Sequence, residues 1–161
     1  MEIQGLINTL MDKGLRTDVR IDAATKLGQD KIQQAIPYLL QCLAEENAYL
    51  RANVISALGD IGAKKAVKPL IAILQNDGNY HVRRATAYAL GEIKGPQALT
   101  ALNTSLTTEN AVITRLALIN AIKNIGGARA LTALKIAAKD KNRDVSKAAK
   151  QAIVELQGEK Q

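Results

Sequence analysis

The chain has 161 residues and 47% hydrophobic content, enough for one ordinary domain, and its apolar runs are far shorter than the roughly 20 residues needed to cross a bilayer. Cys42 and His81 are the single cysteine and the single histidine, which excludes an intrachain disulfide and the ordinary zinc ligand sets. The formal net charge of +7 lies mainly at one end: residues 1–114 hold 12 basic and 11 acidic side chains, whereas residues 115–161 hold 10 and 4.

A repeat of 31 or 32 residues runs through the whole chain. One apolar column recurs in its second half, at Leu27, Leu58, Leu90, Ile122 and Ile153. Two further columns, four residues apart, recur in its first half, at Leu6, Tyr38, Leu70, Leu102 and Leu134, and at Leu10, Cys42, Leu74, Leu106 and Ala138. Apolar residues spaced by four indicate helices. Each repeat is therefore predicted to be a helix A, a turn and a helix B.

Glycine and proline mark the expected ends of these helices. The B helices are expected to stop at Leu27-Gly28, Ile61-Gly62, Lys94-Gly95, Gly126-Gly127 and Gln157-Gly158. Pro37, Pro69 and Pro96 lie early in A helices. The repeats then run over about 1–29, 30–62, 63–95, 96–127 and 128–158. We therefore expect an all-α protein, a single domain over 1–161 built as a right-handed α-α superhelix of five two-helix repeats.

The two ends of the stack differ from its middle. Gly14 is expected to end the first A helix early, which makes the first repeat a short cap. In the last repeat Lys135 and Lys150 replace residues that are apolar in the equivalent columns. A stack of repeats needs polar outer faces at its ends, so the last repeat is predicted to be the C-terminal cap.

One segment carries a resemblance to a known family. Residues 82–93 read VRRATAYALGEI, and Ala66-Val67-Lys68-Pro69-Leu70 supplies the preceding half of the pattern. This pattern resembles the HEAT-like repeat of phycobilisome lyase subunits, over nearly the whole chain. The resemblance implies an α solenoid. It leaves the activity open, because the family contains bilin lyases, chromophore-related proteins and plain interaction modules, and it supplies no catalytic residue for this chain.

A second pattern consists of charged residues. Arg20, Arg51, Arg83 and Arg115 recur near the start of the B helices, and Ser146 takes this place in the last repeat. Acids precede that column by six residues in every repeat except the first, at Glu45, Asp77, Glu109 and Asp140. Pairing each arginine with the acid of the following repeat uses every member. We therefore predict four inter-repeat ion pairs along one edge, solvent-exposed and contributing about 0 to 1 kcal/mol each.

The outward columns of the B helices are the predicted binding surface. In stacks of this kind the B helices line the concave side, and their exposed positions include Arg84, Tyr88, Leu116 and Asn120. These residue types are common at interface hot spots. The same face carries Ser56, Glu92 and Asn124. We expect this surface to hold another protein.

The functional expectation is a non-catalytic scaffold or adaptor, because no nucleophile with a base, carboxylate pair or phosphate loop is present. The alternative, from the resemblance, is a subunit or helper of a bilin lyase or another phycobilisome-associated chromophore protein, with a bilin or phycobiliprotein as partner. A further alternative is nucleic-acid backbone binding through the basic C-terminal repeat, which ranks below the other two because the aromatics that stack on single strands are absent and the lysines are scattered. The beginning of the sequence lacks a secretory signal pattern. A cytoplasmic protein without metal, cofactor or membrane association is therefore expected.

Overall fold

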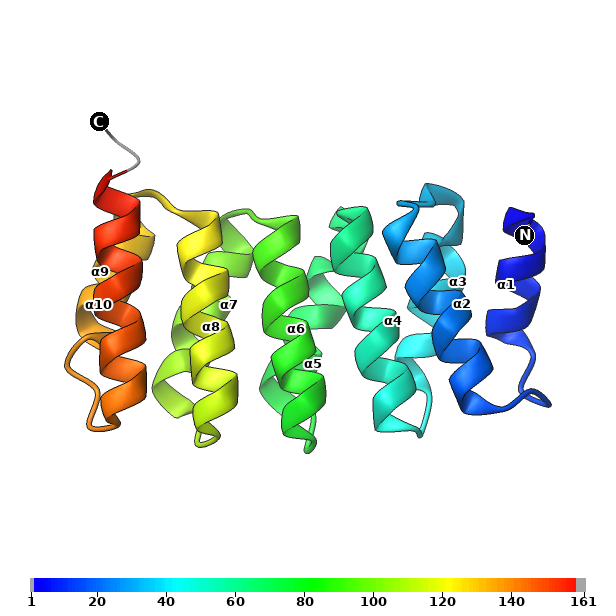
Figure 1. Cartoon of the computed structure of the whole chain (residues 1–161), viewed down its shortest axis with the longest axis horizontal. Coiled ribbons are helices and arrows are strands. Elements are labelled where there is room, and N and C mark those ends of the chain that lie inside the picture. Colours follow the sequence, from blue (N-terminus) through cyan, green and yellow to red (C-terminus); the bar gives the residue numbers. More distant parts are fainter. Residues whose placement is uncertain (1, 159–161) are drawn as a thin grey trace.

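The computed structural model describes residues 2–158, which form a stack of helices in two layers (Figure 1). No β-strand occurs in this part of the chain. In chain order the helices are α1 (Ile3–Met11), α2 (Thr17–Gln29), α3 (Ile36–Gln41), α4 (Ala48–Ile61), α5 (Val67–Asn76), α6 (Tyr80–Ile93), α7 (Pro96–Thr108), α8 (Val112–Ile125), α9 (Gly127–Ala137) and α10 (Arg143–Gly158). Short 3₁₀ turns precede α3 and α5, and another follows α3.

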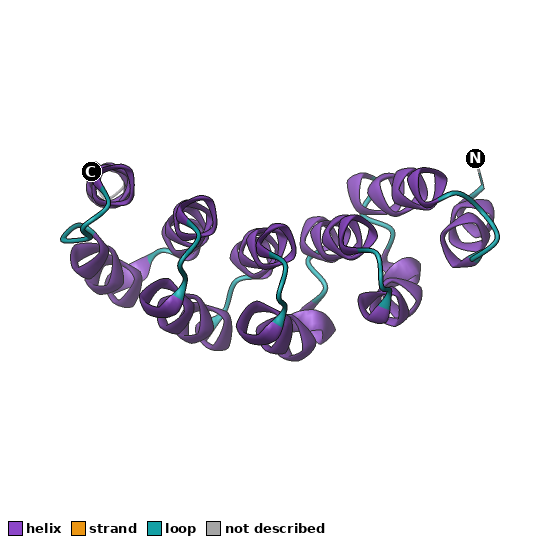
Figure 2. Ribbon diagram, turned by 90° about the horizontal axis from the view of Figure 1, so that it is seen from below, coloured by secondary structure: helices purple, strands orange, loops and turns teal. Residues whose placement is uncertain are grey.

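The odd-numbered helices are the A helices and the even-numbered helices are the B helices. Seen end-on, the B helices lie on the inner side of a shallow arc and the A helices lie on its outer side (Figure 2). The all-α solenoid predicted from the sequence is thereby confirmed. Within the described residues no helix is both long and apolar enough to span a membrane.

Leucine, isoleucine and alanine fill the core continuously from one repeat to the next. The largest side chains with no exposed surface are Leu10, Leu27, Leu39, Leu50, Ile55, Leu58, Leu70, Leu90, Leu102, Leu118, Ile119 and Ile122. They come from both layers and from four successive repeats, so each repeat covers the apolar face of its neighbour. Burial of this kind is the main source of stability in a solenoid.

Successive B helices approach each other very closely where glycine lies opposite alanine. A Cβ atom added to Gly28 would lie 2.7 Å from the Cα of Ala57, and one added to Gly59 would lie 2.6 Å from the Cα of Ala89. Gly91 and Ala121 repeat the arrangement at 2.8 Å. Real Cβ atoms do not come this close to backbone, so these three glycines are required for the spacing of α2, α4, α6 and α8.

This packing corrects the prediction that Gly28 ends the first B helix. Gly28 lies inside α2, and the residue that takes the left-handed conformation is Lys31, with φ of 52°. Lys31 donates its N–H to Gly28 O, as Gly62 (φ of 73°) donates to Gly59 O at the end of α4. Gly158 is likewise still helical. A stop glycine and a packing glycine look alike in the sequence, which is why Gly28 was misassigned.

Two further expectations about A helices were wrong. In the second repeat the fully buried side chain is that of Leu39, whereas Tyr38, which stands in the apolar column, is only half-buried. The buried residues Leu39 and Cys42 are three positions apart, and the chain continues from Cys42 as a 3₁₀ turn, in which positions three apart share a face. The first A helix ends at Met11, before Gly14, which lies in the turn and donates its N–H to Asp12 Oδ1.

The close approach of α4 and α6 predicts the effect of a single methyl group. We expect Gly59→Ala to lower the free energy of unfolding by about 1 to 3 kcal/mol, because the new Cβ overlaps Ala89. Intrinsic helix propensity alone would make the alanine variant more stable by about 1 kcal/mol. A decrease in the free energy of unfolding would therefore be due to the overlap with Ala89. Urea unfolding measures the difference. Gly78→Ala, where a Cβ meets nothing within 4 Å, is the matched control, and equal stabilities of the two variants would contradict the packing.

Candidate functional site

Four arginines of the B helices each contact an acid of the following repeat, close to the turn between its A and B helices. The N to O distances are 2.7 Å for Arg20 and Glu45, 3.0 Å for Arg51 and Asp77, 2.7 Å for Arg83 and Glu109, and 2.7 Å for Arg115 and Asp140. These are the four inter-repeat pairs predicted from the sequence. Each arginine contacts the acid of the following repeat, which is the direction indicated by the missing arginine of the last repeat and the missing acid of the first.

The first three arginines also donate to backbone carbonyls of their own repeat, Arg20 to Leu10 O at 2.8 Å, whereas the side chain of Arg115 bonds, among the described residues, only to Asp140. Arg51 Nη1 donates to the carbonyls of Glu45 and Glu46, and Arg83 Nη1 donates to the carbonyl of Asp77. The acids in turn accept backbone N–H groups of the turn, as Asp77 Oδ1 does from Asn79 at 2.8 Å. One arginine therefore fixes the turn of its own repeat and the position of the next.

The expectation that these pairs are solvent-exposed was wrong. Between 6% and 20% of each side-chain surface is accessible, with Glu109 at 6% and Arg83 at 20%. The reason is that the carboxylates lie beneath the turns, where they also accept hydrogen bonds from backbone N–H groups. The arginine hydrogen bond is the main reason that the pKa of Glu45 and of Glu109 lies below its usual value. Removing one member leaves a poorly solvated charge, so breaking one of these pairs should cost more than the roughly 0 to 1 kcal/mol expected for an exposed pair.

The predicted binding residues lie on the inner face, around a hollow of about 640 Å³ between α6 and α8. Of these residues Tyr88, Glu92, Asn120 and Asn124 line the hollow. Arg84 is exposed on α6, four residues before Tyr88 and so on the same helix face. Leu116 and Ser56 do not line it: Leu116 is half-buried against the core, and Ser56 donates its hydroxyl to the carbonyl of Ala52.

Polar bridges between neighbouring B helices hold several of these side chains. Tyr88 donates its hydroxyl to Asp60 Oδ1 at 2.5 Å, and this bond to a carboxylate raises the pKa of Tyr88 well above its usual value. Asn124 donates its amide to Glu92 Oε1 at 2.7 Å. Arg84 and Asn120, in contrast, make no side-chain hydrogen bond within residues 2–158, so their donors are free for an occupant.

Several residues of the hollow were not predicted. Lys94, Ala117 and Lys123 line it together with Gly91 and Ala121, which pack against each other. Lys123 pairs with Glu155 at 2.6 Å, and that bond is the main cause of the lowered pKa of Glu155. The available signal was the break in the glycine column, because Lys123 stands where Gly28, Gly59 and Gly91 stand in earlier repeats.

The single cysteine and the single histidine lie away from the hollow. Cys42 is 2% exposed, its Sγ is 3.8 Å from Met11 Sδ, and burial raises the pKa of its thiol. His81 packs its ring between Tyr80 and Tyr49 at the start of α6, with ring centroids 4.0 and 6.2 Å away. Among residues 2–158 no three His, Cys, Asp or Glu side chains gather as metal ligands would.

The fold and the inner face define a helical-repeat protein whose consecutive hairpins are joined by buried ion pairs. Residues 3–78 and 67–154 match HEAT repeats, so the chain belongs to the HEAT-repeat family. Its repeats are of the HEAT-like kind found in phycobilisome lyase subunits.

Two relatives come from this group. The bilin biosynthesis protein PecE of Mastigocladus laminosus is 49% identical over 59 residues, which are 36% of this chain and 22% of PecE. A chain in the structure of the complex of CpcE and CpcF of phycocyanin lyase from Nostoc sp. PCC7120 is 27% identical, with a TM-score of 0.78 over 97% of this chain and 65% of that one. The chain therefore spans less than two thirds of either relative.

A second solved structure is similar in fold alone. It is the crystal structure of an engineered protein, 18% identical, with a TM-score of 0.65 over 98% of this chain and 86% of that one.

The inter-repeat pairs predict a difference between two arginines. Arg83→Ala should lower the free energy of unfolding by about 2 to 3 kcal/mol, because Glu109 is left nearly buried without its partner. Arg16→Ala is the control, since Arg16 and Asp18 form a pair whose side chains are 82% and 59% exposed, and its effect should stay within about 0.5 kcal/mol. Urea unfolding near neutral pH measures both. Equal effects would contradict a structural role for the buried pairs.

The same carboxylates predict a dependence of stability on pH. The folded pKa of Glu45 and Glu109 is lowered, so their contribution is complete above the unfolded pKa of about 4.3 and is lost as the pH falls through the folded pKa. The urea midpoint of the wild type should therefore decrease from about pH 6 to about pH 3. Arg83→Ala should show a smaller decrease because Glu109 has lost the cause of its shift. Parallel curves for the two proteins would rule out this origin.

Proposed function

We propose that the chain is a non-catalytic HEAT-repeat subunit or helper of a bilin lyase, which holds a bilin and a protein partner on its inner face. The observation that carries the proposal is the likeness to the CpcE and CpcF complex, because it extends over 97% of the chain at 27% identity. The 59-residue match to PecE supports the same reading. A general protein-binding scaffold is compatible with this role and is less specific.

The chemistry of the hollow suits a flat, conjugated ligand with carboxylates. Its volume of about 640 Å³ lies within the range of about 300 to 1,000 Å³ typical of small-molecule sites. Bilins are linear tetrapyrroles with two propionate groups. The free guanidinium of Arg84 can bind a propionate, and Asn120 can hydrogen-bond a pyrrole ring edge. Tyr88, held by Asp60, presents its ring in a fixed orientation.

The chain itself is not proposed to form the bond between bilin and protein. A thioether needs an accessible thiolate, and Cys42 is buried with a raised pKa. The acceptor cysteine and any proton donor would come from the partner protein. The role of this chain would be to hold the two reactants together, which lowers the entropic cost of their encounter.

Nucleic-acid binding by the C-terminal repeat stays a prediction without added support. The side chains that suggested it, Lys139, Lys141, Arg143 and Lys147, are all exposed. Their exposure suits any acidic partner equally well.

Titration of the purified chain with phycocyanobilin tests the ligand half of the proposal. We expect a shift of the visible absorbance band and a rise in bilin fluorescence, because the hollow restricts a flexible chromophore. Arg84→Ala and Asn120→Ala should each weaken binding by about tenfold, which corresponds to one lost polar contact of about 1.4 kcal/mol. Lys147→Ala, on α10 and outside the hollow, controls for unspecific attraction of propionates. Unchanged spectra, or equal affinity of all three variants, would refute the bilin site.

A further inference from the structure

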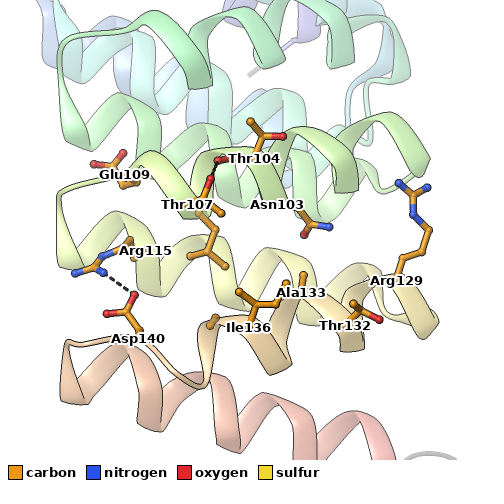
Figure 3. A pocket seen from close by; sticks show the side chains of 12 residues that line it. Asn103, Thr104, Thr107, Glu109, Arg115, Arg129, Thr132, Ala133, Ile136 and Asp140 are labelled. Atoms are coloured by element: carbon orange, nitrogen blue, oxygen red, sulfur yellow. Dashed lines mark hydrogen bonds and ion pairs between the residues drawn. The ribbon is translucent and has the colours of Figure 1, made fainter.

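A second depression lies on the outer side of the stack, opposite the hollow, between α7 and α9 (Figure 3). Its volume is about 650 Å³. Leu106 on α7 and Ala133, Ile136 and Ala137 on α9 give it an apolar lining. Arg115 lies at one end and Arg129 at the other, as Figure 3 shows. This α7–α9 groove is unrelated to the bilin site and does not depend on it.

The groove lies at the one junction that lacks the glycine contact of the earlier repeats. Gly28, Gly59 and Gly91 bring each B helix against the next, whereas Lys123 takes their place on α8 and reaches across to Glu155 on α10. The side chain of a lysine does not allow backbones to approach as glycine does. The last repeat therefore joins the stack through a different contact.

Unsatisfied polar atoms gather in the groove. Among residues 2–158 the buried side-chain nitrogen or oxygen atoms without a hydrogen-bond partner are Asn103 Oδ1 and Arg115 Nε, and both residues line it. Arg115 makes one hydrogen bond, to Asp140 Oδ2, whereas Arg83 makes three, two of them to Glu109. Native proteins rarely leave such groups unpaired, so the polar side chains beneath the groove are less completely satisfied than those of the earlier repeats.

An exposed apolar side chain accompanies them. Ile136 is 65% exposed and lines the groove together with Leu106, Ala133 and Ala137, so it belongs to an apolar patch and is not an isolated exposed side chain. The occupant would therefore place an apolar side chain on Ile136 and Ala133, between the polar groups of Asn103 and Arg115.

The groove is also lined by Glu109 and Asp140, but each of these acids is paired with an arginine, Glu109 with Arg83 and Asp140 with Arg115. The charges left for an occupant are therefore cationic, and the depression is long. Arg129 is exposed, donates to Thr100 Oγ1 at 3.0 Å and has no acid partner among the described residues. A smaller depression, of about 440 Å³, adjoins the groove at Arg129 and Thr104. It extends toward α5 and includes the exposed Lys68. The two together run across three A helices. An open depression of this length suits a peptide better than a small molecule, which a site normally encloses.

We propose that the α7–α9 groove binds an acidic, amphipathic peptide segment of a partner protein, with an apolar side chain on Ile136 and carboxylates toward Arg129 and Lys68. Asn103 lines the groove and makes no side-chain hydrogen bond among residues 2–158, so its amide N–H can donate to a carbonyl of the peptide. Nucleic acid would leave Ile136 uncovered, and a single fatty acid would reach only one of the cationic ends.

Selection from a library of short random peptides displayed on phage tests this proposal. Peptides are depleted on the Ile136→Glu variant and then selected on the wild-type chain. Val154→Glu is the matched control, because Val154 is 63% exposed on α10 and does not line the groove. Circular dichroism and urea unfolding establish that the variants are folded.

We expect enrichment of sequences with apolar residues flanked by Asp or Glu. A selected peptide should bind the wild type and Val154→Glu with the same affinity. It should bind Ile136→Glu and Arg129→Ala at least about tenfold more weakly. Absence of enriched peptides, or equal binding to all variants, would overturn the proposal. Displacement of the peptide by dodecanoate at a similar concentration would also overturn it, since the groove would then be a site for small amphipathic carboxylates.

Discussion

The close contact between glycine on one B helix and alanine on the next determines most of what is seen in this structure. At Gly28, Gly59 and Gly91 the neighbouring backbone lies where a side chain would otherwise be. This contact sets the close spacing of the B helices, which form the inner layer of the arc, while the A helices form its outer layer (Figure 2). The buried pairs of arginine and acid act at the ends of the same helices and fix their register, because each arginine holds two repeats at once.

Both proposed sites follow from this arrangement. Where the contact is present, between α6 and α8, the helices lie close and polar side chains such as Tyr88 and Asn124 bridge to acids of the preceding helix around the inner hollow. Where it is replaced by the pair of Lys123 and Glu155, the outer side carries an apolar groove with unsatisfied polar atoms. A solenoid with occupants on opposite faces could hold a small ligand and a protein partner without competition between them.

The features that repeat at a fixed spacing could be predicted from the sequence. The helical hairpins follow from the period, because equivalent residues meet equivalent neighbours. The partners of Arg20, Arg51, Arg83 and Arg115 follow from the period together with the missing arginine of the last repeat and the missing acid of the first. The features that depend on depth or on helix geometry could not be predicted in the same way. The role of Gly28 could not be predicted because its partner Ala57 is 29 positions away in the sequence. The half-burial of Tyr38 depends on a 3₁₀ turn that changes the buried face of its helix. The burial of the ion pairs depends on turns that cover the carboxylates. The α7–α9 groove depends on the distance between two helices, which cannot be inferred from the residues at any one position of the repeat.

Native-state hydrogen exchange tests most directly whether the glycine contacts couple the repeats. Helices α2 and α10 are the first and last B helices, but α2 is joined to its neighbour through Gly28 and Ala57, whereas the pair of Lys123 and Glu155 bridges α8 and α10. We expect the amides of α2 to share the protection of α4 and α6, and the amides of α9 and α10 to open together at a lower free energy. Protection of α10 equal to that of α2 would contradict the account.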